Sequence, residues 1–168
     1  MSEDLDRLNT FNALPVEEAA EKLLLCCGSR AWARRMAESR PFQSLADLRE
    51  KSDRLWRSLN GADWQEAFAA HPRIGEKGSR WSEQEQAGAR SADAQTIAEL
   101  IAANRLYETR FDHIFIVCAT GKTAAEMLGL LRARLGNDPE TELRIAAEEQ
   151  RKIINLRLEK LLLKGINS

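Results

Sequence analysis

The stretch PETELRIAAEEQRKIINLRLEKLLL, residues 139–163, decides the fold class. At about 100° per residue, its apolar side chains fall within a stripe about 100° wide, which is typical of a long amphipathic helix packed on a core. The stripe also includes one glutamine, and its members are Leu143, Ala146, Gln150, Ile153, Ile154 and Leu161. We therefore expect one helix over residues 139–163.

Helical signals also dominate the rest of the chain. Start and stop residues predict further helices over 15–28, 29–40, 44–60, 63–70, from 82 onward, 92–111 and 123–135. Residues 71–81 hold one proline and two glycines, which indicates a loop. The sequence predicts an all-α, single-domain bundle of roughly eight to nine helices spanning residues 1–168.

Residues 114–118, IFIVC, form the one convincing extended segment. A single strand has no partner with which to build a sheet. We therefore expect a short, buried, extended connector between two helices.

Composition limits the classes of partner. The chain has 168 residues, and 25 basic residues against 26 acidic ones give a net charge of −1. This balance disfavours nucleic-acid binding, which normally requires a basic excess. No apolar run is long enough to cross a membrane, and the acidic start MSEDLDRL does not resemble a signal peptide. We expect no nucleic-acid partner, no membrane association and a cytoplasmic location.

Cysteine and histidine spacing argues against a metal site. The three cysteines form no CxxC pair, and Cys26 and Cys27 follow an apolar stretch where buried thiols pack as small hydrophobes. The two histidines form no HxxxH motif. Gly121-Lys122-Thr123 lacks the earlier glycine of a phosphate-binding loop, because residue 116 is isoleucine. The four tryptophans are expected to be packing anchors.

His71 is a candidate proton donor. Pro72 follows it and disfavours helical geometry at position 71, so the preceding helix should end there. The carboxyl end of a helix stabilises a cation, which suits an imidazolium that gives up a proton. A histidine that only caps the helix end is the alternative.

Two further positions allow both a structural and a functional interpretation. Ser82-Glu83-Gln84-Glu85 has the form of a capping box, but a helix amino terminus also offers amides to an anion. Arg157 falls inside the apolar stripe of 139–163, where a guanidinium needs a carboxylate from the protein or from a ligand. A structural ion pair and an anion-binding role both remain open for Arg157.

Several motifs in order give the chain a family resemblance. They are HPRIG at 71–75, SEQEQAG at 82–88, NRLYETRF at 104–111, FIVCA at 115–119, and EQRKI at 149–153 followed by LRL at 156–158. Phe11-Asn12 and Arg40-Pro41-Phe42 extend the match toward the amino terminus. The series resembles the 2-oxo-4-hydroxy-4-carboxy-5-ureidoimidazoline (OHCU) decarboxylases of purine breakdown.

The resemblance implies an all-helical, cofactor-free and metal-free homodimer that converts OHCU to (S)-allantoin and carbon dioxide. It implies that His71 transfers the proton and that Glu85 and Arg157 complete the catalytic set, with Arg157 holding the anionic part of the substrate. The substrate-binding residues it implies are Pro72, Ser82, Glu83, Gln84, Glu85, Gln86, Phe115, Ile116, Val117, Cys118 and Ala119. The ending Gly165-Ile166-Asn167-Ser168 differs from the peroxisomal signal of many eukaryotic relatives, which favours a bacterial cytoplasm.

Two other functions remain as alternatives. One is a metal-independent enzyme acting on another ureido intermediate of purine breakdown. The other is a helical binding module without catalysis, in which Arg157 pairs with a protein carboxylate.

Overall fold

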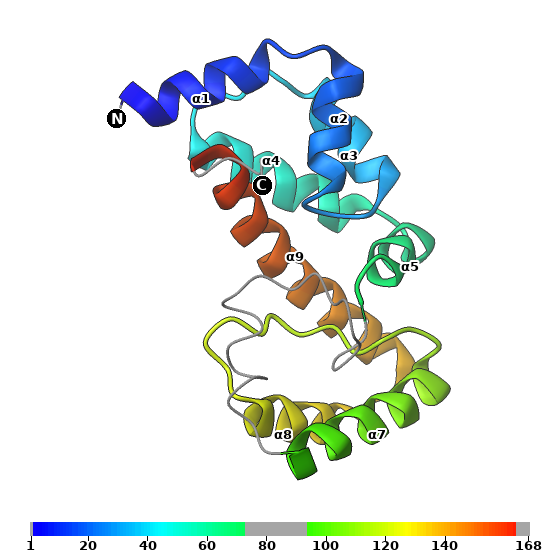
Figure 1. Cartoon of the computed structure of the whole chain (residues 1–168). Helices are drawn as coiled ribbons and strands as arrows, with labels where there is room; N and C mark the ends of the chain where they lie inside the picture. The colour runs from blue at the N-terminus through cyan, green and yellow to red at the C-terminus, as the bar shows by residue number, and fades with distance from the viewer. Residues whose placement is uncertain (1, 73–93, 164–168) are drawn as a thin grey trace. The chain divides into compact units, whose positions relative to one another are not determined.

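The computed structural model describes residues 2–72 and 94–163, and within them helices are the only regular secondary structure. The described residues form eight helices and no strand (Figure 1). The helices are α1 (Ser2–Asn12), α2 (Val16–Leu24), α3 (Arg30–Glu38), α4 (Leu45–Ser58), α5 (Gly61–Ala69), α7 (Ala94–Phe111), α8 (Ala124–Arg134) and α9 (Pro139–Leu163). The predicted all-α class is confirmed, and α9 covers the residues that its sequence pattern predicts.

Hydroxyl side chains begin three of these helices as expected. Ser29 Oγ accepts a hydrogen bond from Trp32 N, and Ser44 Oγ accepts one from Asp47 N. Thr123 precedes α8 in a full capping box with Glu126. Each cap satisfies a backbone amide that has no partner inside its helix.

The amino-terminal helix α1 is not among the predicted helices. Its first turn carries Glu3 and Asp4, which the positive end of the helix dipole favours. Its buried positions, Leu8 and Phe11, are only three residues apart. So short an apolar pattern is a weak helical signal, which explains why the sequence analysis missed this helix.

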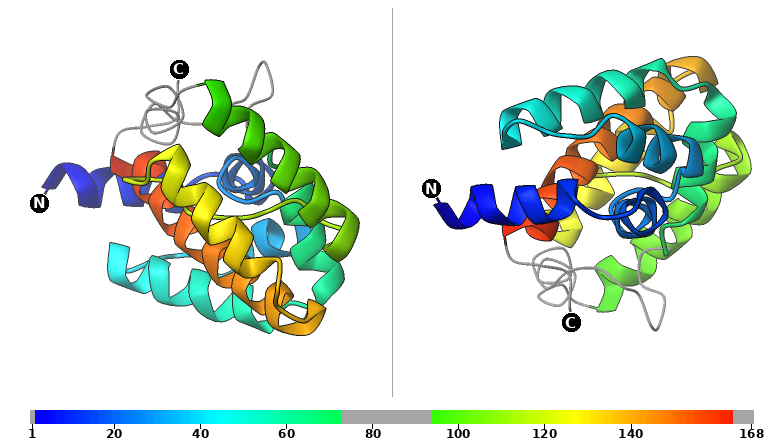
Figure 2. Two further views of the ribbon diagram at one scale, coloured as in Figure 1. Left: turned by 90° about the horizontal axis from the view of Figure 1, so that it is seen from below. Right: turned by 90° about the horizontal axis from the view of Figure 1, so that it is seen from above.

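The chain divides into two compact units. The first comprises residues up to Ala67 together with residues from Arg151 onward, and the second comprises Phe68–Gln150. In the first unit α2 packs on α3, and α3 packs on α4 (Figures 1 and 2). In the second unit α7 packs on α8. Helix α9 supplies residues to both units.

Tryptophans and cysteines fill the core of the first unit. Trp32 and Trp56 are fully buried, and Trp64 Nε1 donates a 2.9 Å hydrogen bond to Trp56 O. Cys26 and Cys27 are buried free thiols. The packing role predicted for Trp32, Trp56 and the two cysteines is confirmed, whereas Trp81 lies outside the described residues.

Two of the family-like segments contact each other in this first unit. Asn12 exchanges two hydrogen bonds of 2.9 Å with the backbone of Phe42, one through each end of its amide. Arg40 Nη1 donates to Phe11 O and to Leu14 O, each at 2.8 Å. Hydrogen bonds between motif residues that are far apart in the sequence therefore connect the end of α1 to the segment before α4.

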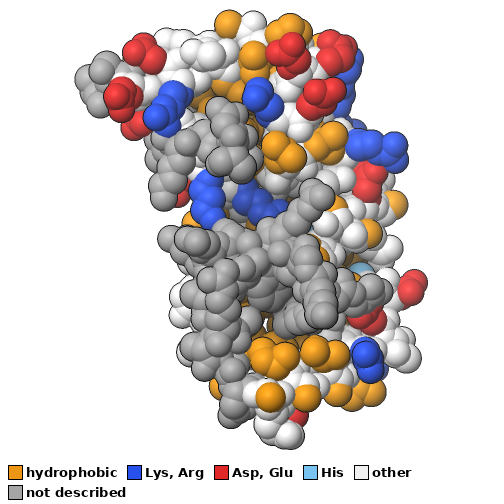
Figure 3. All heavy atoms as spheres, in the orientation of Figure 1, with side chains coloured by type: hydrophobic (Ala, Val, Ile, Leu, Met, Phe, Trp, Pro, Cys, Tyr) orange, Lys and Arg blue, Asp and Glu red, His pale blue; other side chains and the backbone are white. Residues whose placement is uncertain are grey.

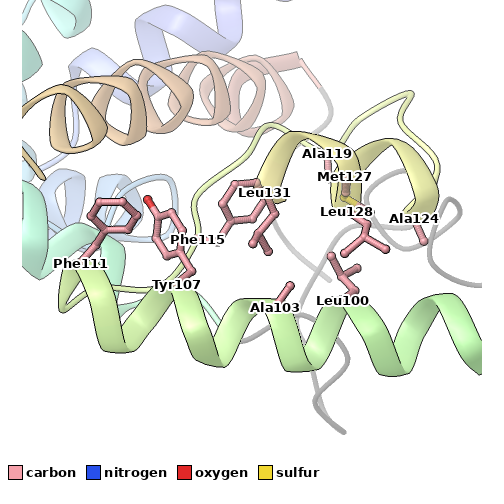
Figure 4. Packing of buried hydrophobic residues seen from close by; sticks show 10 residues of the cluster. All are labelled: Leu100, Ala103, Tyr107, Phe111, Phe115, Ala119, Ala124, Met127, Leu128 and Leu131. Atoms are coloured by element: carbon pink, nitrogen blue, oxygen red, sulfur yellow. The ribbon is translucent and has the colours of Figure 1, made fainter. Parts of the chain in front are cut away.

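The second unit is built around an apolar cluster shared by α7, α8 and the segment between them. Figure 4 shows these side chains pointing toward one another. The buried members are Leu100, Ala103, Tyr107, Phe111, Phe115, Ala119, Ala124, Met127, Leu128 and Leu131. Residues 114–119 are extended without forming a strand, as predicted, and Phe115 and Ile116 are buried.

On the face that Figure 3 shows, the described residues include exposed side chains of both charge signs. Exposed ion pairs within helices include Arg34–Glu38 at 3.5 Å and Arg144–Glu140 at 2.8 Å. This mixture agrees with the nearly equal numbers of acidic and basic residues. Within the described residues, no helix combines the length and hydropathy needed to span a membrane.

Candidate active site

His71 lies just beyond the end of α5, as its position before Pro72 predicts. Its backbone amide donates a 3.1 Å hydrogen bond to Phe68 O, which closes the last turn. The side chain is partly buried, and Nε2 lies 2.6 Å from Gln150 Oε1. The candidate proton donor is thus fixed at both its backbone and its ring.

Gln150 is the contact of His71 that sequence reasoning missed. The sequence pattern places Gln150 in the apolar stripe of α9, and its side chain is indeed fully buried. Its Oε1 faces the imidazole, while its Nε2 has no hydrogen-bond partner among the described residues. A polar side chain within an apolar stripe was the available signal, but helical periodicity cannot name a partner 79 residues away.

The extended segment 115–119 takes its hydrogen bonds from helix side chains. Phe115 N donates to Asn104 Oδ1 on α7 at 3.2 Å. Arg134 Nη1, from the last turn of α8, donates to Ile116 O at 2.7 Å. Buried backbone groups need partners, and here side chains replace the neighbouring strand that a sheet would supply.

Cys118 is held by two further side chains. Its amide donates a 3.0 Å hydrogen bond to Glu149 Oε1, and its carbonyl accepts one of 2.8 Å from Lys122 Nζ. Glu149 and Gln150 are adjacent on α9. One turn of that helix therefore contacts both His71 and the segment predicted to line the substrate pocket.

A buried charge network supports this segment. Arg134 and Glu142 form an ion pair in which Glu142 is fully buried, and Tyr107 Oη donates a 2.6 Å hydrogen bond to Glu142 Oε1. The guanidinium also lies over the Phe115 ring, 4.4 Å from its centroid. Burial, followed by the hydrogen bond to Glu142, raises the pKa of Tyr107 above its ordinary value. The phenol therefore acts as a neutral donor to the carboxylate.

Arg157 belongs to the first unit, on the carboxyl-terminal part of α9. Its side chain is partly buried, as its place in the apolar stripe predicts, whereas Lys152 is exposed. Burial raises the pKa of Cys26 and of Cys27 to about 12, and the positive charge of Arg157 acts in the opposite direction on both. The guanidinium is thus close enough to two buried thiols to act on them electrostatically.

Arg151 lies outside the apolar stripe of the same helix, where periodicity alone would place it in solvent. Its side chain is partly buried, and Nη1 lies 3.5 Å from Asp53 Oδ2. Asn155 Nδ2 also donates to Asp53, at 3.1 Å. A carboxylate on α4 therefore draws Arg151 out of the solvated face that periodicity alone assigns.

The remaining predicted site residues are Ser82, Glu83, Gln84, Glu85 and Gln86, and they lie outside the described residues. Residues 73–81 of the predicted loop 71–81 and the predicted helix start at Ser82 lie there as well. Pro72, partly buried, ends the described part before them. Among residues 2–72 and 94–163, no group of three or more His, Cys, Asp or Glu side chains is arranged to hold a metal ion.

The model of the OHCU decarboxylase family matches residues 12–159. The chain belongs to this family. The motifs at 71–75, 82–88 and 115–119 therefore predict the family correctly, and all of them fall inside the matched range.

Curated relatives of this OHCU decarboxylase family member are of two kinds. The uric acid degradation bifunctional protein TTL of Arabidopsis thaliana is 40% identical over 157 residues, which are 88% of this chain and 48% of that protein. The bifunctional protein PucL of Bacillus subtilis is 32% identical, over 92% of this chain and 32% of its own length. The chain thus spans from a third to a half of these bifunctional relatives. An OHCU decarboxylase of Amia calva is 33% identical over 73% of this chain and 75% of its own.

A solved structure shares the fold. An OHCU decarboxylase crystallised in the presence of (S)-allantoin is 40% identical and superposes with a TM-score of 0.76, over 83% of this chain and 95% of that one. An (S)-allantoin synthase structure is similar in fold, with a TM-score of 0.69 at 19% identity.

Proposed function

We propose that this chain decarboxylates OHCU and releases (S)-allantoin and carbon dioxide, as a carboxy-lyase of urate breakdown. The observation that carries the proposal is the family match over residues 12–159. The 40% identity to an OHCU decarboxylase crystallised in the presence of (S)-allantoin supports the same reaction.

The chemistry requires few groups from the protein. The bond between the ring carbon and the carboxylate breaks, and its electron pair passes into the adjacent imine of the substrate itself. The imine nitrogen takes up a proton, and the hydroxyl group on the decarboxylated carbon loses its proton to become the ring carbonyl. A proton also adds to the ring carbon that bears the ureido group, and the face of this addition sets the (S) configuration. Orientation, charge stabilisation and one directed proton are sufficient. We propose on this ground that the reaction uses no cofactor or metal.

His71 is the residue we assign to the proton. It lies at a helix end, where a cation is favoured, and its ring is held at 2.6 Å by Gln150. A fixed ring can deliver its proton to one face of the substrate. The alternative role as a simple helix cap does not need the ring contact with Gln150.

The other site residues receive their roles from the family motifs. We propose that Glu85 and its neighbours from Ser82 to Gln86 contact the ureido and ring groups, with Pro72 beside His71. Residues 115–119 would line the pocket with backbone amides and carbonyls. Arg157 would hold the anionic part of the substrate, because its guanidinium matches a carboxylate in charge and geometry.

We also propose that the protein acts as a homodimer in a bacterial cytoplasm. The three free cysteines support a reducing compartment, since thiols persist there without pairing. Light scattering after size-exclusion chromatography measures the oligomeric state, and a monomer at working concentration would contradict this proposal.

Circular dichroism tests the reaction directly. Urate is first oxidised completely by urate oxidase and hydroxyisourate hydrolase, and the signal is followed with and without this protein. We expect rapid growth of the (S)-allantoin signal, unchanged when a chelator is present. A racemic product formed at the spontaneous rate would contradict the proposed function and favour a non-catalytic binding module.

A further inference from the structure

Only one end of the buried side-chain amide of Gln150 has a hydrogen-bond partner among the described residues. Its side chain is fully buried, Oε1 lies 2.6 Å from His71 Nε2, and Nε2 has no hydrogen-bond partner among the described residues. Burying half of an amide without a partner costs free energy that an apolar side chain of similar size would avoid. The neighbours of Gln150 in the stripe of α9 are apolar, so stability alone does not account for a glutamine there.

The contact determines which ring nitrogen carries hydrogen. An amide oxygen only accepts hydrogen bonds, so the His71 nitrogen facing it must be protonated. In the neutral ring, the lone pair then lies on Nδ1. In the imidazolium, Nδ1 holds the proton that can be given away while the hydrogen bond to Gln150 stays intact.

We propose that Gln150 is a positioning residue that holds His71 in the Nε2–H tautomer, so that Nδ1 is the nitrogen that exchanges the proton with the substrate. The claim that Nδ1 exchanges the proton with the substrate rests on the proposed function. The claim that Gln150 fixes the Nε2–H tautomer concerns the protein without substrate and is tested separately.

The geometry around His71 supports this assignment. Glu149, the next residue on α9, directs Oε1 to the Cys118 amide at 3.0 Å. Gln150, rather than the adjacent Glu149, therefore faces His71 Nε2, and it does so with a neutral amide oxygen. A neutral acceptor orients the ring in both protonation states, whereas a carboxylate would favour the imidazolium.

Nitrogen NMR of the imidazoles provides the first test. The chain has only two histidines, so loss of one set of signals in His71→Asn assigns the other set to His113. We expect His71 in the parent protein to be protonated on Nε2 when neutral, and Gln150→Leu to remove this preference. A neutral His71 protonated on Nδ1 would overturn the proposal, because the amide would then present nitrogen to the ring.

Kinetics of two substitutions provide the second test. We expect Gln150→Leu to reduce kcat by at least about tenfold. General acid catalysis contributes about 10²–10⁴-fold to the rate, and a wrongly oriented imidazole would lose part of that factor. We expect its unfolding temperature to equal or exceed that of the parent. Gln150→Glu keeps an acceptor oxygen, so it should restore part of kcat and move the His71 limb of the pH profile upward, because an anion stabilises the imidazolium.

Glu148→Gln is the matched control, since Glu148 is exposed on the same turn of α9. Parent-like kcat and pH profile in Gln150→Leu would overturn the positioning role. If the parent protein fails to accelerate (S)-allantoin formation, the proposed function fails, and the NMR result still decides the tautomer.

Discussion

Arg134 Nη1 donates a 2.7 Å hydrogen bond to the carbonyl oxygen of Ile116, and the same guanidinium pairs with the fully buried Glu142. One side chain therefore links α8, α9 and the extended segment before α8. Because no strand lies beside segment 115–119 in the described part of the chain, contacts of this kind help to determine where its backbone lies. Because we propose that this segment lines the substrate pocket, we expect stability and activity to be coupled through these buried polar groups, and this coupling can be measured.

Glu142→Gln should lower the free energy of unfolding by about 3 kcal/mol or more, because it leaves the Arg134 charge buried without its partner. Urea unfolding followed by circular dichroism measures the change. Glu140→Gln on the same helix is the control, since the Glu140–Arg144 pair is exposed and should contribute no more than about 0.5 kcal/mol. Equal effects of the two substitutions would contradict the importance of the buried pair.

Asn104→Leu should destabilise the protein by about 1–3 kcal/mol, because the buried amide of Phe115 loses its acceptor. We also expect KM for OHCU to rise, since the amino-terminal end of segment 115–119 loses its anchor. The control is Gln95→Ala on α7, whose side chain bonds Glu99 at the surface. Parent-like stability of Asn104→Leu would show that another group satisfies the amide.

His71→Asn should abolish both the rate acceleration and the stereochemical preference while the protein stays folded. The loss should be about 10²–10⁴-fold, the usual contribution of a general acid or base. His113→Asn is the contrasting variant, because the His113 ring packs against Phe68, Tyr107 and Phe111. It should lose stability and still give (S)-allantoin. Parent-rate formation of (S)-allantoin by His71→Asn would refute the proton-transfer role.

Arg157→Gln should raise KM by about 10- to 100-fold, because this factor corresponds to the free energy of one lost hydrogen bond to a charged group. Arg157→Lys should recover part of this loss, because the charge remains without the planar guanidinium. Lys152→Gln controls for the removal of one positive charge from α9. An unchanged KM together with lower stability would identify the structural ion pair that the sequence also allows.

Cys26 and Cys27 should resist alkylation in the folded protein at about pH 8, because a pKa near 12 leaves almost no thiolate to react. Mass spectrometry after iodoacetamide treatment, with and without concentrated urea, measures this protection. Rapid labelling of either residue in the folded protein would contradict the raised pKa.

The same two thiols make the stability fall at alkaline pH. Their pKa values rise from 9.0 to about 12 on folding, so the folded protein holds these protons more tightly than the unfolded chain does. This contribution is complete below about pH 9 and is lost as the pH rises toward 12. Replacing both cysteines by alanine should flatten the slope of unfolding free energy against pH in that range.

Local patterns were sufficient to predict much of the fold. The stripe on residues 139–163 predicts α9 with its observed bounds, and the hydroxyl residues at 29, 44 and 123 predict three helix starts. These signals act over one or two turns, where hydrogen bonding and amphipathicity are determined by neighbouring residues.

Long-range polar contacts could not be predicted in the same way. Arg134 occupies the last turn of α8, where a basic residue is ordinary, so nothing nearby indicates its bonds to Glu142 and Ile116. Gln150 and His71 likewise meet only in the folded chain. Their pairing depends on how helices pack, which periodicity does not specify.

The anchors of segment 115–119 hold its backbone by amides and carbonyls, which every residue other than proline possesses in full. Val117 packs against the apolar cluster of the second unit and Cys118 is buried, so side chains of similar size and polarity at these positions should leave the main chain in place. A designer who wished to test the proposed pocket lining could vary these two positions conservatively while leaving Asn104, Arg134 and Glu149 untouched. Such a library would explore new pocket shapes on an unchanged frame.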